Sequence, residues 1–209
     1  MRDRTRHVAA HGSTLIGWAM TVLSEQEFLV LNGAHLKKMA TAKELASVLG
    51  LDVGVVEAVL NAAAKDGLLM APEGKHLLLP EGTSAVHEYY RTAYEPLRSN
   101  ELVLAWYERF EVINEQFIKQ VSEWQSSDGD ERLQSRLIKT VERLTKNLLE
   151  LTPLIPRYEI YVDRFNASVA RIDQGDKDYV CKPTIDSVHN VWFEFHEDIL
   201  SVIGRPRDT

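Results

Sequence analysis

The sequence is poor in cysteine and in long apolar runs. Its 209 residues include one cysteine, Cys181, which excludes an internal disulfide and a cysteine-rich zinc site. No apolar run approaches the roughly 20 residues that a membrane span requires. The segment Ser13–Leu23 is apolar but short, and it lacks the small-residue cleavage site of a secretory signal, so we interpret it as a helix of the mature fold. These absences favour a cytoplasmic protein with no membrane contact.

Positive charge and catalytic motifs are also scarce. The chain carries 24 lysines and arginines against 31 aspartates and glutamates, which gives a net charge of −7. This balance does not favour binding to a polyanion such as DNA. The sequence contains no glycine-rich nucleotide loop, no H-E-x-x-H metal motif and no G-x-S-x-G nucleophile motif. We therefore expect no enzyme activity, no cofactor and no bound metal.

The part of the chain before residue 83 has the pattern of a winged helix. Its expected elements are helices at Glu25–Lys38, Ala42–Leu49 and Val53–Lys65 and strands at Leu68–Ala71 and His76–Leu79. Ser24 and Glu27 form a capping box for the first helix, and Asp52 caps the third. Gly67 is placed to end the third helix in a left-handed conformation. The expected core consists of Phe28, Leu31, Leu36, Leu45, Leu49, Val56 and Leu60.

The third helix would be the DNA-reading helix of such a fold, but its outward face is poor in DNA-reading residues. A reader of the major groove needs Arg, Lys, Asn, Gln, Ser or Thr on that face. Asn61 is the one such residue on the expected outward face, whose other members are Val53, Gly54, Val55, Glu57, Ala58 and Ala62. The expected wing carries Glu73, Gly74, Lys75 and His76. Residues 41–82 contain three lysines against six acidic residues. Because phosphate contacts dominate DNA affinity, we expect any DNA binding to be weak.

The part of the chain after residue 83 has a helical period to its end. We expect a linking helix at Ser84–Arg98, stopped or kinked near Pro96. Four longer helices follow at Glu101–Gln125, Glu131–Leu151, Arg157–Asp173 and Thr184–Ile203, and Gly175 and Pro183 bound a loop between the last two. Short connections between amphipathic helices are typical of an antiparallel bundle. The expected fold is therefore mainly α, with a winged-helix domain over residues 1–83 and a helical bundle over residues 84–209.

Two histidines in the last helix are the most distinctive chemical feature. At 100° per residue His189 and His196 share one face with Phe193, so we expect both imidazoles to point into the bundle. One interpretation is a pair of buried histidines that hold the core together through hydrogen bonds. The alternative is a ligand pocket formed by His189, Trp192 and His196. The Glu-x-x-His spacing of di-iron bundles is absent from these helices, which disfavours a metal site.

Residues 41–82 resemble the winged helix of MarR-type regulators. The resemblance rests on Lys43-Glu44-Leu45-Ala46, Gly50-Leu51, Val56, Val59, Leu60, Gly67-Leu68-Leu69 and Leu79-Pro80-Glu81-Gly82. The same segment is similar to the dimerisation winged helix of small-molecule O-methyltransferases, which does not bind DNA. No methyltransferase glycine loop follows it. The C-terminal part, with Trp124-Gln125, Pro156-Arg157-Tyr158 and Asp186–Leu200, faintly resembles a family of actinobacterial winged-helix proteins, from which no site residue is carried over.

These observations predict a non-enzymatic winged-helix regulator whose helical domain dimerises or senses a small molecule. One alternative is an interaction or adaptor module whose winged helix binds a protein instead of DNA. A second alternative is an enzyme subunit with a pocket in the bundle. We also expect a homodimer through Ser13–Leu23 and the long helices, because a helix that is apolar all round must be buried.

Overall fold

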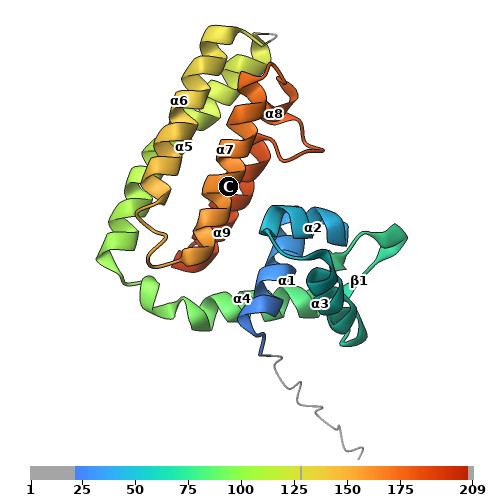
Figure 1. Cartoon of the computed structure of the whole chain (residues 1–209). Helices are drawn as coiled ribbons and strands as arrows, with labels where there is room; N and C mark the ends of the chain where they lie inside the picture. Colours follow the sequence, from blue (N-terminus) through green and yellow to red (C-terminus); the bar gives the residue numbers. More distant parts are fainter. Residues whose placement is uncertain (1–21, 128, 207–209) are drawn as a thin grey trace, which may run out of the picture.

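The computed structural model describes residues 22–127 and 129–206 and is mainly α-helical, as expected (Figure 1). Three short helices and a two-stranded hairpin come first, and longer helices make up the rest. The predicted apolar helix Ser13–Leu23 lies outside the described residues except for Val22 and Leu23. Among the described residues, no helix is long and apolar enough to cross a membrane.

The first three helices begin and end where local signals predict. They are α1 (Glu25–Lys37), α2 (Ala42–Leu49) and α3 (Val53–Lys65). The capping box of Ser24 and Glu27 is present, and the Asp52 side chain accepts hydrogen bonds from the first backbone amides of α3. Gly67 has a φ of +71°, which confirms the predicted left-handed end. These boundaries depend on contacts within one turn of helix, so the sequence alone predicts them.

A short hairpin follows α3. Its strands β1 (Leu69–Met70) and β2 (Leu77–Leu78) are antiparallel, with Leu69 opposite Leu78, and are shorter at both ends than predicted. The 3₁₀ turn Pro72–Gly74 lies between them. A further bridge joins Ala40 to His76 and so ties the hairpin to the chain just after α1.

The predicted N-terminal core is confirmed. Its members from α1, α2 and α3 are buried except Leu49, which is partly buried against the same cluster. This cluster continues without a break into the core of the long helices. The apolar faces of α1, α2 and α3 therefore close against one another, as their periodicity predicts.

The helix α4 (Pro80–Ala93) begins earlier than predicted. The sequence predicted the end of the wing at Leu79-Pro80-Glu81-Gly82 and a helix from Ser84, but proline is well tolerated in the first turn of a helix and starts one here. The predicted boundary at residue 83 therefore falls inside α4, which contacts both α1 and the last helix. The expected stop near Pro96 is present as the 3₁₀ turn Glu95–Leu97.

The long helices rise from one end of α4 (Figure 1). They are α5 (Glu101–Ser126), α6 (Glu131–Leu148), α7 (Glu159–Asp173) and α9 (Val188–Ile203), with the 3₁₀ turn Pro156–Tyr158 before α7 and the short helix α8 (Asp178–Cys181) before α9. The ion pairs Arg109–Glu150 and Arg136–Glu123 show that α5 and α6 run antiparallel. The last helix starts four residues later than predicted, because Ser187 caps it.

Aromatic rings fill the space between α5, α7 and α9. Phe110 stacks on Trp106 and meets Phe195 edge to face, with ring centroids 5.6 and 5.4 Å apart. Phe117 stacks on Trp192 with centroids 3.7 Å apart. Rings of this size dominate the energetics of a core. They fix α9 in the centre of the fold, where it contacts α1, α4, α5, α7 and α8.

Candidate functional site

The predicted DNA- or partner-facing surface of α3 is open to solvent. Its exposed members are Gly54, Glu57, Ala58, Asn61 and Ala62, while Val53 and Val55 are half-buried. The predicted wing residues Glu73, Gly74 and Lys75 are exposed as well. His76 differs, because its ring nitrogen lies 3.3 Å from the carbonyl oxygen of Ala40 and helps to hold the hairpin. The face of α3 is therefore exposed and carries the acidic side chain of Glu57 at its centre.

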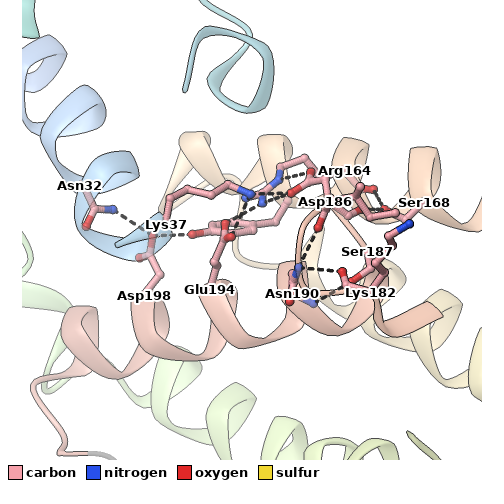
Figure 2. A network of polar contacts seen from close by, with 12 residues as sticks. Asn32, Lys37, Arg164, Ser168, Lys182, Asp186, Ser187, Asn190, Glu194 and Asp198 are labelled. Atoms are coloured by element: carbon pink, nitrogen blue, oxygen red, sulfur yellow. Dashed lines mark hydrogen bonds and ion pairs between the residues drawn. The ribbon is translucent and has the colours of Figure 1, made fainter. Parts of the chain in front are cut away.

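A buried carboxylate, Asp198, joins the N-terminal helices to the long helices. It is fully buried on α9 and forms a two-pronged ion pair with Arg157. The hydroxyls of Tyr158 and Tyr161 donate to it at 3.2 and 2.9 Å, and the Asn32 amide of α1 donates at 3.4 Å. Asp198 therefore accepts bonds from three separate elements, and Figure 2 shows its link to Asn32.

The positive partner of Asp198 is enclosed by aromatic rings. The guanidinium of Arg157 lies 4.9 to 5.7 Å from the ring centroids of Phe28, Tyr90, Tyr94 and Tyr158. Burial opposes its charge, but Asp198 holds the pKa of Arg157 well above its usual value. Burial also raises the pKa of Tyr158 well above 10. The ion pair is thus desolvated, and the loss of Asp198 would leave the guanidinium of Arg157 buried without a partner.

A second group of charges lies beside the first, around Glu194 of α9 and Asp186 just before that helix. Lys37, in the last turn of α1, lies 2.8 Å from Asp186 and 3.0 Å from Glu194. Arg164 of α7 binds the same two carboxylates, at 2.5 and 2.6 Å. Although burial would raise the pKa of Asp186, Arg164 and Lys37 lower it. Two cations and two carboxylates thus neutralise one another across three parts of the fold.

Hydrogen bonds to two backbone carbonyl oxygens fix the segment before α9, which contains Asp186. Ser168 donates to the carbonyl oxygen of Asp186 at 2.7 Å, and the Asn190 amide donates to that of Ile185 at 2.7 Å. Figure 2 shows Asn190, Glu194 and Asp198 in a row along one side of α9. We call the residues Asn32, Lys37, Arg157, Arg164, Asp186, Glu194 and Asp198 the junction network. Its outer side forms part of a cleft of about 480 Å³ between α2, the hairpin and α9, which we call the α2–α9 cleft.

The prediction for the two histidines is wrong for His189. His196 is buried, with its ring 5.1 Å from that of Phe110, whereas His189 is exposed and Phe193 is 39% exposed. The helix is rotated relative to the expectation, so that the side carrying Glu194 and Asp198 faces inward. The apolar pattern predicts that the side with His189 is buried. In the structure the side with the two carboxylates is buried instead, because each carboxylate has a cationic partner.

The three residues predicted to form a pocket do lie around one. His189, Trp192 and His196 line a cavity of about 210 Å³ between α5 and α9, which we call the α5–α9 pocket. The indole N–H of Trp192 donates to Asn114 of α5 at 2.9 Å. His196 also lies 3.8 Å from Glu111. Within the described ranges, no group of three His, Cys, Asp or Glu side chains could hold a metal ion.

Sequence reasoning missed the junction network, although two signals point to it. Glu194 and Asp198 are four residues apart in a helix rich in apolar residues, and Arg157 and Arg164 are seven apart in the segment that leads into and forms α7. Each spacing places its pair on one side of a helix. The pairing between them depends on the tertiary arrangement, which neither spacing reveals.

Replacing His196 with alanine should lower the melting temperature by several degrees, since it leaves a cavity and removes a buried polar group, at about 1–3 kcal/mol plus a cavity cost. His189→Ala is the matched control, because His189 is exposed and such changes stay within about 0.5 kcal/mol. Calorimetry of both variants checks this, and equal large losses would contradict the placement of the two rings. Elemental analysis of the same samples tests the expected absence of metal: a stoichiometric ion that disappears in either variant would refute it.

The chain matches no protein-family model, no curated protein and no solved structure. The side chains of this chain are therefore the basis for a functional proposal.

Proposed function

We propose that the protein is a non-enzymatic regulator in which a winged helix is coupled to a helical bundle that dimerises or senses a small molecule. The winged helix corresponds to α1, α2, α3 and the hairpin, and the bundle to α5, α6, α7 and α9. The observation that carries the proposal is the junction network. It links α1 to α7 and α9 through buried charges, so that a change in the bundle alters the support of the winged helix.

The chemistry of α3 favours a protein partner over a specific DNA site. Three members of its open face, Gly54, Ala58 and Ala62, recur every fourth residue and leave little side chain above the backbone. Glu57 lies beside them and would repel phosphate. A second candidate function, an interaction module that uses α3 against another protein, is supported by this exposed acidic face. In either case the proposal includes a homodimer, located in the cytoplasm.

The test measures binding of the full-length protein to duplex DNA by fluorescence anisotropy, together with selection from a random duplex pool. At about 150 mM salt we expect at most non-specific binding, with a dissociation constant of roughly 10⁻⁴ to 10⁻⁶ M and no enriched sequence. A specific site bound at about 10⁻⁸ M or tighter would support a DNA-binding regulator and contradict the preference for a protein partner.

A charge-reversed variant is the control for this experiment. Glu57→Lys combined with Ala58→Lys adds positive charge on the exposed face of α3, so DNA affinity should rise and become more dependent on salt. Sedimentation equilibrium of the unmodified protein reports the oligomeric state. A mass of 23.8 kDa for the single chain, unchanged over micromolar concentrations, would refute the homodimer.

A further inference from the structure

The α5–α9 pocket has a firm inner wall. Phe117 and Trp192 are stacked with an interplanar angle of 4°, and both rings are buried. The bond from Trp192 to Asn114 fixes the orientation of the indole. A cavity with such a wall is already formed before any ligand enters, which lowers the cost of binding.

The mouth of the pocket exposes apolar surface on both helices. Ile118 of α5 is 58% exposed and Phe193 of α9 is 39% exposed, and both line the pocket. Exposed large apolar side chains that meet around one cavity are typical of a binding site. A ligand in the pocket would cover the inner parts of both.

The lining of the pocket carries no lysine, arginine, aspartate or glutamate. Its polar groups are the hydroxyl of Ser122, the amide of Gln125, the imidazoles of His189 and His196, and the side chains of Asn114 and Trp192, which bond to each other. Although the His189 side chain is exposed, the protein partly encloses it, and this partial desolvation lowers its pKa, which favours the neutral ring at pH 7. An ionised ligand would lose hydration here without gaining an opposite charge from the lining, whereas a neutral molecule would meet hydrogen-bonding groups.

The size of the pocket limits the ligand further. Its volume of about 210 Å³ is below the roughly 300–1,000 Å³ of pockets for drug-sized molecules. We propose that the α5–α9 pocket binds an uncharged, ring-sized aromatic molecule with one hydrogen-bonding group. This inference rests on the ligand-sensing part of the proposed function and names the class of ligand.

The pocket is connected to the junction network by one side chain. Phe193 lines both the α5–α9 pocket and the α2–α9 cleft. The next residue, Glu194, binds Lys37 of α1 and Arg164 of α7. A ligand that moves Phe193 therefore acts within one residue of the ion pairs that hold α1.

The test uses two probes of similar size, indole and benzoate, titrated into the full-length protein at pH 7.5 by calorimetry. Indole is neutral with one N–H donor, and benzoate is ionised. We expect saturable binding of indole with a dissociation constant of about 1 mM or tighter, and binding of benzoate at least about tenfold weaker. No saturation by indole, or equal affinity for benzoate, would overturn the proposal.

Two variants locate the binding. Ile118→Asp places a charge at the mouth and should weaken indole at least about tenfold, while Val112→Asp, at an exposed position of the same helix that does not line the pocket, should leave it unchanged. Unchanged affinity in Ile118→Asp, confirmed as folded by circular dichroism, would also overturn the assignment. The indole and benzoate titrations involve neither DNA nor a protein partner. Failure of the pocket assignment would therefore appear in these titrations, whereas failure of the regulatory proposal would appear in the DNA-binding experiment.

Discussion

Replacing Asp198 with alanine should lower the free energy of unfolding by about 3–5 kcal/mol, because it leaves the Arg157 guanidinium buried without its counter-charge. Asp198 is fully buried, and the same change strands the donors of Tyr158, Tyr161 and Asn32. For a chain of this length each kcal/mol lowers the melting temperature by about 2–4 °C. Urea denaturation should therefore show the loss of free energy of unfolding, and calorimetry should show a melting temperature lowered by about 6–20 °C.

Two comparisons separate the buried charge from a general effect of the substitution. Asp163→Ala removes an exposed aspartate from α7 and should change stability by no more than about 0.5 kcal/mol. Removing both charges, with Arg157→Met and Asp198→Leu together, should cost less than the sum of the single losses. An Asp198→Ala protein as stable as the Asp163→Ala control would show that the ion pair does not hold the junction.

Replacing Gly82 with alanine should also destabilise the protein, by about 1–3 kcal/mol or more, because the site has no room for a methyl group. A Cβ at this position would lie 2.1 Å from the carbonyl oxygen of Leu68 and 2.4 Å from a methyl of Leu78. At an exposed position inside a helix, replacing glycine with alanine is stabilising by roughly 1 kcal/mol. A loss of stability in Gly82→Ala would therefore show that α4 approaches the hairpin closely.

The measurement is urea denaturation, with hydrogen exchange to locate the change. The amide of Leu79 donates to the same Leu68 oxygen at 2.9 Å, so its protection should fall first. Ser84→Ala, at an exposed site in the same helix, is the control and should be near neutral. A Gly82→Ala variant at least as stable as the unmodified protein would mean that α4 and the hairpin are not in contact.

Local chemistry in the sequence determined where the first three helices begin and end. Ser24 with Glu27, and Asp52, satisfy backbone amides one turn away, and Gly67 adopts a conformation that other residues avoid. These interactions do not depend on the rest of the fold. The apolar period of the helices likewise predicts which side chains close the N-terminal core, because a single stripe can be buried in one way only.

The tertiary structure alone decided how closely α4 packs on the hairpin and which side of α9 faces inward. Gly82, predicted to end the wing, instead lies in α4 and packs that helix against Leu68 and Leu78, a contact that depends on the position of both residues. The apolar count on α9 favoured the side with His189 and Phe193, yet Glu194 and Asp198 are buried because Lys37, Arg157 and Arg164 reach them from elsewhere in the chain. Burying a charged carboxylate is costly unless it forms an ion pair with a cation. Which cation forms that pair depends on the assembled fold.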